Sequence, residues 1–264
     1  MSGIKQDLED SDLIVYCFRH QESLLNVSGY GTENSPLTDR GRSEAGTVRA
    51  LVDNIGIDGI VTGTIPRHVQ TLDELGTLDI PVIQDDNLNA IIGGYLFEEP
   101  DKRKVEERYR LIRFKADETG LYHASGFSFD PKKEQIFPFG IYCSAIVDRR
   151  LRELVFEGDD PLTSFEEIEQ RVKDFQNNLR EQVNPDRQTT LACIGSCSSL
   201  SFIYEFVKYG TIGENIVDLE SEQPRLYPQE HQEFSVLHLN PNEERIKLYL
   251  AREPIKDYLV RQDD

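Results

Sequence analysis

The sequence predicts an α/β fold of three layers, with helices on both faces of a mostly parallel sheet. Apolar runs of strand length alternate with amphipathic helical segments between residues 13 and 83, which is typical of βαβ units. The same alternation resumes after residue 164. Near the end of the chain, two strand-like runs flank a turn sequence, which predicts an antiparallel hairpin at one edge of the sheet.

The first half of the fold begins with "LIVYCF" (Leu13–Phe18), a continuous apolar run that suits a central parallel strand. A helix is expected directly after Thr38, whose side chain is a good N-cap. Apolar residues recur at helical spacing on one face of this helix: Ala45, Val48, Leu51 and Val52. Next come a strand, a helix that starts near Pro66 and ends near Gly76, and a third strand: 57–63, 65–78 and 80–85.

Between residues 87 and 160 the alternation is lost, and we expect an insertion that forms a lid of helices and loops over the sheet. Beyond it, Ser164 and Glu167 form the capping-box pattern at the start of a helix. A strand, a helix and the two strands of the hairpin follow in order: 189–195, 199–209, 234–240 and 245–250. The chain is therefore expected to be a single domain over residues 1–264, with a frayed N-terminus at residues 1–12.

The composition predicts a soluble globular protein with an acidic surface. Lys plus Arg number 29 against 48 Asp plus Glu, which gives a net charge of −19. Such a field repels nucleic acid and anionic membranes, so neither is an expected partner. No apolar run approaches the roughly 20 residues of a membrane helix. The four cysteines form no Cys-x-x-Cys pair and the five histidines show no ligand spacing, which predicts a reduced, cytoplasmic protein without metal or cofactor.

Basic side chains follow two of the predicted strands. Arg19 and His20 come directly after the first strand, and Arg67 lies on the first turn of the helix after the second. The carboxyl ends of parallel strands meet at one edge of a sheet, where ligands bind. Planar guanidinium groups match the oxygens of a phosphoryl group in a bidentate way. These residues therefore predict a pocket for phosphate or for a phosphorylated small molecule or protein.

The motifs around these residues resemble those of the histidine phosphatase superfamily, which has the phosphoglycerate mutase-like fold. Five segments carry the resemblance in the order of the family: "RHQESLLN", "SPLTDRGRSEA", "IVTGTIPRHVQT", "SFEEIEQRVKDF" and "FSVLHLN". The resemblance implies that His20 is a nucleophile that forms a phosphohistidine, which requires a neutral ring nitrogen. It also implies that Arg19 and Arg67 hold the phosphoryl oxygens, without a metal. Asn26 and Ser23 would line the pocket.

Two parts of the family's catalytic set have no match in the chain. Ser196 stands where the family has a second His, and Ala90 aligns with the Glu that serves as proton donor. Gln21 replaces the Gly that normally follows the nucleophile. A positioned general acid contributes about 10²–10⁴ in rate and one transition-state hydrogen-bond donor about 10²–10³. The loss of both groups therefore favours a degenerate enzyme.

Four residues are candidates to replace the missing groups: Ser196, Glu98, Glu99 and His68. The two glutamates lie at the start of the insertion, within reach of the site if this segment swings in. His68 directly follows Arg67, and one residue further along a helix its side chain is expected to point elsewhere. A serine or cysteine nucleophile within "GSCSS" is not favoured, because this segment does not match Gly-x-Ser-x-Gly.

Three functional hypotheses follow. The first is a pseudo-phosphatase that binds phosphate or a phosphorylated ligand, turns it over slowly or not at all, and acts as a scaffold or sensor. The second is an active phosphomonoesterase or mutase that works through phospho-His20. The third is a structural subunit of a larger assembly, in which the lid or the acidic surface contacts a protein partner and the pocket is vestigial.

Overall fold

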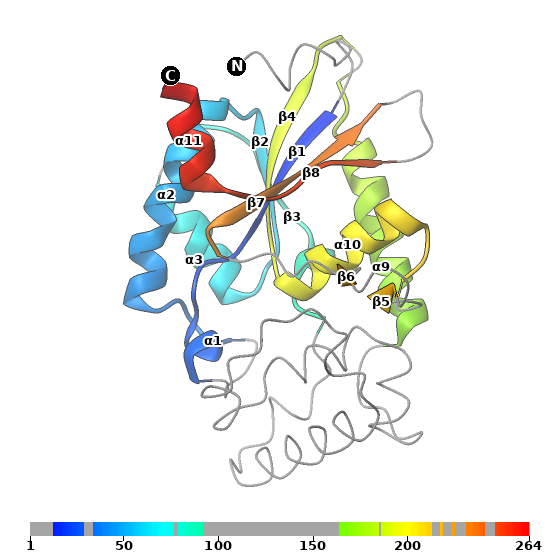
Figure 1. Cartoon of the computed structure of the whole chain (residues 1–264), viewed down its shortest axis with the longest axis horizontal. Coiled ribbons are helices and arrows are strands. Elements are labelled where there is room, and N and C mark those ends of the chain that lie inside the picture. The colour runs from blue at the N-terminus through cyan, green and yellow to red at the C-terminus, as the bar shows by residue number, and fades with distance from the viewer. Residues whose placement is uncertain are drawn as a thin grey trace, which may run out of the picture.

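The computed structural model describes nine stretches of the chain: residues 13–28, 34–76, 79–91, 164–184, 186–212, 217–218, 223–224, 231–240 and 246–263. Its centre is a six-stranded sheet in the order β3-β2-β4-β1-β7-β8 (Figure 1). The strands are β1 (Leu13–Arg19), β2 (Gly59–Thr62), β3 (Val82–Gln84), β4 (Thr189–Gly195), β7 (Glu233–Leu239) and β8 (Lys247–Pro254). The first four are parallel, and β7 and β8 form an antiparallel edge. The predicted fold class is confirmed.

Helices cover both faces of the sheet, as Figure 1 shows. On one face lie α2 (Asp39–Ile55), α3 (Pro66–Glu74) and α11 (Ile255–Asp263). On the other lie α9 (Phe165–Arg180) and α10 (Cys197–Tyr209). Shorter elements complete the described part of the chain: α1 (Leu24–Ser28), the 3₁₀ turn η1 (Asp86–Leu88), and the two-residue strands β5 (Val217–Asp218) and β6 (Gln223–Pro224).

The alternation of side chains along β1 divides the core into two clusters. Leu13, Val15 and Cys17 belong to the cluster on the side of α9 and α10. The residues between them point to the opposite face and pack with α2 and α11. Because both faces of β1 are covered by helices, the strand is apolar from Leu13 to Phe18, which explains the continuous apolar run in the sequence.

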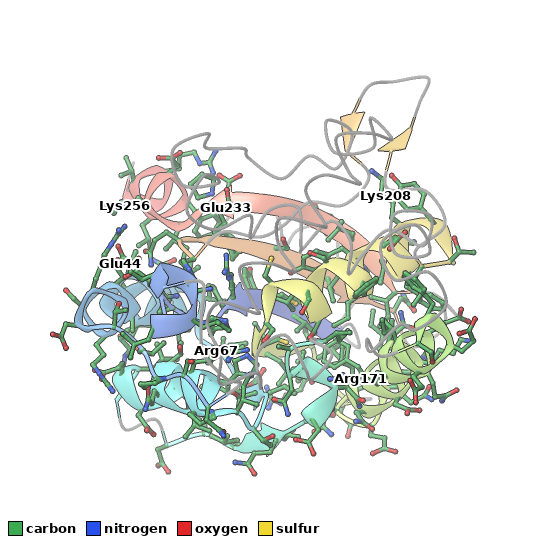
Figure 2. The ribbon with its side chains drawn as sticks, turned by 90° about the horizontal axis from the view of Figure 1, so that it is seen from below. Glu44, Arg67, Arg171, Lys208, Glu233 and Lys256 are labelled. Atoms are coloured by element: carbon green, nitrogen blue, oxygen red, sulfur yellow. The ribbon has the colours of Figure 1, made fainter. Side chains whose placement is uncertain are left out.

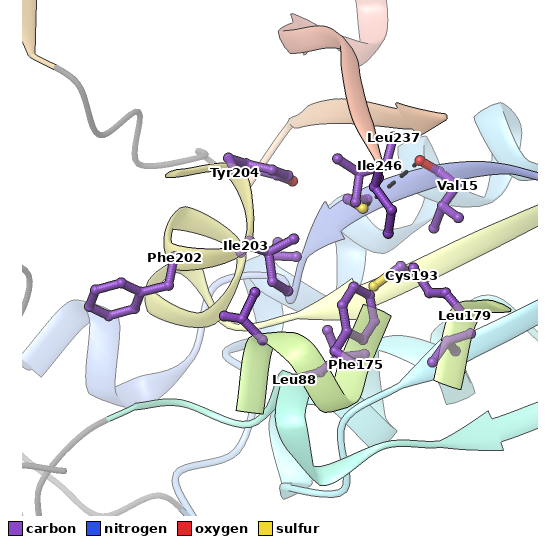
Figure 3. Packing of buried hydrophobic residues seen from close by; sticks show 14 of the residues in the cluster. Val15, Leu88, Phe175, Leu179, Cys193, Phe202, Ile203, Tyr204, Leu237 and Ile246 are labelled. Atoms are coloured by element: carbon purple, nitrogen blue, oxygen red, sulfur yellow. Dashed lines mark hydrogen bonds between the residues drawn. The ribbon is translucent and has the colours of Figure 1, made fainter. Parts of the chain in front are cut away.

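The larger cluster lies between the sheet and the pair of helices α9 and α10 (Figure 3). Phe175 and Phe202 are fully buried there, and Leu88 of η1 belongs to the same cluster. Ile91, just after η1, belongs to the same cluster. The first residues of the predicted insertion are therefore part of the core, whereas residues 92–160 lie outside the described residues, as does the predicted frayed segment 1–12.

Two helices begin where the sequence predicts them. The side chain of Thr38 accepts a hydrogen bond from the Gly41 backbone N–H, and Ser164 forms a complete capping box with Glu167. Two helices were not predicted. The five-residue α1 is too short to show a period. Helix α11 starts directly after β8, and of its side chains described up to residue 261 only Ile255 is fully buried. No helix in the described stretches has the length and apolar character needed to cross a membrane.

Candidate functional site

His20 lies at the carboxyl end of β1, in the middle of the sheet. Its backbone N–H donates to the Gly195 carbonyl of the neighbouring strand (3.0 Å). In the side chain, Nδ1 lies 2.7 Å from the Gln21 carbonyl, and Arg67 Nε donates to Nε2 at 3.0 Å. A carbonyl oxygen can only accept, so Nδ1 carries the ring proton and Nε2 holds the lone pair. This is a neutral imidazole with Nε2 in the form needed for nucleophilic attack.

The two arginines predicted from the sequence both lie beside this ring. Arg19 is the last residue of β1, and Arg67 is the second residue of α3, after Pro66 at the first helical position. Arg67 is 2% exposed, and Figure 2 shows it in the middle of the molecule. Burial lowers the pKa of His20 well below 6.5, and the nearby side chains of Arg67, His68, Arg19 and His231 lower it further.

Ser23 and Asn26 form a turn directly after His20. Asn26 Oδ1 accepts hydrogen bonds from the Ser23 backbone N–H (2.9 Å) and from the Ser23 hydroxyl (2.7 Å). Ser23 is fully buried, whereas Asn26 is half-buried. These bonds fix the start of α1, and a role of the two residues in lining the pocket stays a prediction.

Helix α2 holds this turn in place through an unusually close approach at Gly41. A Cβ atom at this position would lie 2.1 Å from the Glu22 carbonyl oxygen, so only glycine fits. Thr38 adds a backbone N–H bond to the same carbonyl (2.9 Å) and a hydroxyl bond to the Glu22 carboxylate (2.7 Å). The "LTDRG" segment of the sequence therefore positions the residues that follow His20.

The position of His68 differs from the prediction that it points elsewhere. Its ring centroid lies 5.4 Å from that of His20, and the side chain is fully buried. His68 Nε2 lies 2.9 Å from the hydroxyl of Ser196. The first turn of α3 is inserted deeply enough for both Arg67 and His68 to be buried. Gly63 leaves the space for the ring, because a Cβ there would lie 2.0 Å from His68 Nδ1.

Ser196 is the N-cap residue of α10, yet its side chain makes no capping bond and contacts His68 instead. The residue that aligns with the family's second His is therefore linked to an imidazole that comes from another element. Burial and the charge of Arg67 lower the pKa of His68 well below 6.5, against a hydrogen bond with Asn89 that raises it. Ala90, at the expected position of the proton donor, is buried and carries no proton-transfer group. Glu98 and Glu99 lie outside the described residues.

His231 is a third imidazole beside His20 that was not predicted. Its Nδ1 lies 2.7 Å from the His20 carbonyl oxygen, and the two ring centroids are 5.8 Å apart. The segment "EHQEF" contains no motif that points to it. The position of His231 follows only from the way the strands pair in the sheet. Strand β7 is antiparallel to β1 with Phe18 opposite Phe234, so the residues just before β7 must lie beside those just after β1.

The three neutral imidazoles of His20, His68 and His231 make the stability of the fold depend on pH. Burial also lowers the pKa of His231, to about 3, with a further contribution from the charge of Arg19. In the unfolded chain each ring takes its ordinary pKa of 6.5. Below that pH the unfolded chain binds protons that the folded chain does not, so the stability of the fold decreases as the pH falls below 6.5.

The charge of the site is opposite to that of the chain as a whole. The groups that shift the pKa of His20 are two guanidinium groups and two imidazoles, and no carboxylate is among them. The net charge of the chain is −19. Among the described residues, no three His, Cys, Asp or Glu side chains gather in a way that could hold a metal ion. The arrangement therefore suits an anion with several acceptor oxygens.

The fold is that of phosphoglycerate mutase-like structures. Residues 15–130 match the family described as "Histidine phosphatase superfamily (branch 1)", a range that includes part of the predicted insertion. The matched range covers less than half of the chain. No curated protein matches the sequence.

The fold is similar to that of solved structures at low sequence identity. A phosphoglycerate mutase from Bacillus anthracis has 11% identity and a TM-score of 0.63, with 97% of this chain and 98% of that chain covered. YhfR from Bacillus stearothermophilus has 17% identity and a TM-score of 0.59, with coverage of 91% and 96%. A mycobacterial glucosyl-3-phosphoglycerate phosphatase, solved with inorganic phosphate, has 11% identity and a TM-score of 0.58, with coverage of 92% and 98%. At these identities the likeness concerns the fold alone.

Proposed function

We propose that this protein binds phosphate or a phosphorylated ligand at Arg19, His20 and Arg67, and hydrolyses it slowly or not at all. The observation that carries the proposal is the buried contact between Arg67 Nε and His20 Nε2. Two guanidinium groups beside neutral imidazoles attract a phosphate dianion and offer donors for its oxygens. A mycobacterial glucosyl-3-phosphoglycerate phosphatase of similar fold has been solved with inorganic phosphate. The role of such a protein is that of a scaffold or a sensor of phosphorylated ligands.

The second part of the proposal, weak turnover, rests on proton transfer. An alcohol that leaves a phosphate ester needs a proton, and a positioned acid supplies about 10²–10⁴ of the rate. Ala90 occupies the aligned position of the donor, and no carboxylate contributes to the pKa of His20 among the described residues. The described residues therefore supply donors that support phosphate binding, whereas none of their carboxylates contributes a proton donor beside His20.

Titration with inorganic phosphate in a calorimeter tests the binding. Arg67→Ala is expected to weaken the affinity about 100-fold, because it removes charge-assisted bonds of about 1.5–3 kcal/mol each. Arg67→Lys keeps the charge but loses the planar fork, and is expected to weaken binding about tenfold.

The matched control is Arg187→Ala, which removes the same charge from an exposed pair with Asp58 at the other end of β4. It is expected to change the affinity less than about twofold. If the wild-type chain gives no phosphate-dependent heat, the binding proposal is wrong. The hypothesis of a structural subunit with a vestigial pocket then takes its place.

A second candidate function, an active phosphomonoesterase or mutase, is favoured by the contact between His68 and Ser196. If His68 Nε2 carries the ring proton and donates it to Ser196 Oγ, the Ser196 hydroxyl keeps its own proton and can donate it toward a phosphoryl oxygen at the place of the family's second His. His20 Nε2 would attack phosphorus, the ester P–O bond would break, and the electron pair would leave with the alcohol oxygen. Arg67 Nε would then transfer its hydrogen bond from Nε2 to the phosphoryl group.

Phosphohistidine trapping decides between the two functions. With an aryl phosphate labelled at phosphorus, the active enzyme is expected to carry an acid-labile label that His20→Asn abolishes. Ser196→Ala is expected to lower the turnover about 100-fold, as for the loss of one transition-state donor. Because the pKa of His20 lies well below 6.5, labelling should continue at about pH 5.5. Absence of label and of turnover across a panel of phosphate esters would exclude the active enzyme.

A further inference from the structure

Gln21, the residue that replaces the family's glycine, holds His231 at the site through hydrogen bonds. Gln21 is fully buried, and its Nε2 donates to the His231 carbonyl at 3.0 Å. Its Oε1 accepts a hydrogen bond from Gln232 Nε2 at 2.6 Å. The side chain beside the nucleophile therefore binds two successive residues of the segment before β7. A glycine at position 21 would make neither of these bonds.

The ring of His231 has a fixed tautomer. Its Nδ1 faces the His20 carbonyl oxygen at 2.7 Å, so Nδ1 carries the proton. The ring is half-buried and stays neutral at physiological pH, because burial and Arg19 lower its pKa to about 3. Nε2 is then a hydrogen-bond acceptor, and it has no hydrogen-bond partner among the described residues. The ring thus lies next to Arg19 and His20 with an acceptor to offer.

An acceptor in this place does not suit the oxygens of a phosphate group. A phosphate dianion presents acceptor oxygens, and these are matched by the guanidinium donors of Arg19 and Arg67. An acceptor beside them suits a donor on the organic part of the ligand, close to the phosphorus. A hydroxyl group is the neutral donor that fits, since an amine would bring a positive charge next to two guanidinium groups.

We propose that His231 is a ligand-contacting residue whose Nε2 accepts a hydrogen bond from a hydroxyl group near the phosphate of an organic phosphate ester. This inference rests on the proposed phosphate site and adds a specificity-determining residue to it. Gln21 acts as a positioning residue, because it holds the backbone of His231 in place. By holding His231, the glutamine at the family's glycine position favours ligands that carry such a hydroxyl group.

The test compares two phosphonates that differ only in hydroxyl groups and have no ester bond to hydrolyse: propylphosphonate and 2,3-dihydroxypropylphosphonate. Both are titrated into the full chain by calorimetry, next to inorganic phosphate. The wild-type protein is expected to bind the dihydroxy compound roughly five- to tenfold more tightly, as for one neutral hydrogen bond. In His231→Asn the ratio is expected to fall to about 1, since the amide N–H can still donate to the His20 carbonyl but Nε2 is gone.

The matched control is His238→Asn, the same substitution at the other end of β7, where His238 lies opposite Ile14. This variant is expected to keep the wild-type ratio. A ratio near 1 in the wild-type protein, with inorganic phosphate still bound, would overturn the inference but leave the phosphate site intact. A wild-type ratio that persists in His231→Asn would overturn it as well. If inorganic phosphate itself does not bind, the proposed function fails and the inference fails with it.

Discussion

Replacing Gly41 with alanine is expected to destabilise the fold by about 3 kcal/mol, although the change adds a single methyl group to a helix. The new Cβ would lie 2.1 Å from the carbonyl oxygen of Glu22 and 3.0 Å from its backbone carbon and nitrogen. Backbone atoms cannot turn away as the end of a flexible side chain can. The variant must therefore move α2 or the turn that follows His20, and it would disturb the site as well as the stability.

Gly46 provides the matched control because it lies in the same helix and undergoes the same substitution. A Cβ at Gly46 would meet nothing within 4 Å. Gly46→Ala is thus expected to stabilise the chain by about 0.5–1 kcal/mol through helix propensity alone. Urea unfolding of both variants measures the difference. A shift of the midpoint in the same direction for both would contradict the close approach of α2 to Glu22.

Gly63→Ala is expected to expel His68 from the site and to destabilise the fold by about 3 kcal/mol. The added Cβ would lie 2.0 Å from His68 Nδ1 and 2.6 Å from Asn89 Oδ1. The imidazole is fully buried, so it cannot turn aside into solvent. Its contact with the Ser196 hydroxyl would be lost at the same time.

A double-mutant cycle separates this effect from general damage. His68→Ala removes the ring that the new methyl group would meet, so Gly63→Ala should be better tolerated in that background. The expected coupling free energy between the two positions is at least about 1 kcal/mol, measured by urea unfolding of the four proteins. Additive effects within about 0.5 kcal/mol would mean that His68 does not occupy the space next to Gly63.

The architecture could be predicted because the apolar patterns of the sequence match the residues that the fold buries. Strands β1 and β4 are buried on both faces and therefore appear as apolar runs, and the four residues predicted for one face of α2 are all buried. The rule that parallel strands present ligand-binding residues at their carboxyl ends brought Arg19, His20 and Arg67 together, as the structure has them. Their function in phosphate binding stays a prediction.

The other two imidazoles depend on tertiary packing that no local pattern encodes. Helical geometry predicts that His68 points away from Arg67, toward an exposed face of the helix. The start of α3 is instead buried on more than one side, so both side chains lie inside the protein. His231 lies 211 positions after His20, and only the register of β7 against β1 brings it there. The exposure of a helix end and the register of an antiparallel pair are both set by the whole fold.

The long sequence separation of these contacts has a consequence for how the chain folds. His20 takes one partner from Arg67, 47 positions later, and another from His231, 211 positions later, while β4 is inserted between β1 and β2. Such high contact order predicts slow assembly, because the entropy of closing long loops is lost before the contacts form. A growing polypeptide that ends before β4 already contains both arginines but not the strands that align them. The ligand would then bind only the completely folded chain and not these shorter intermediates.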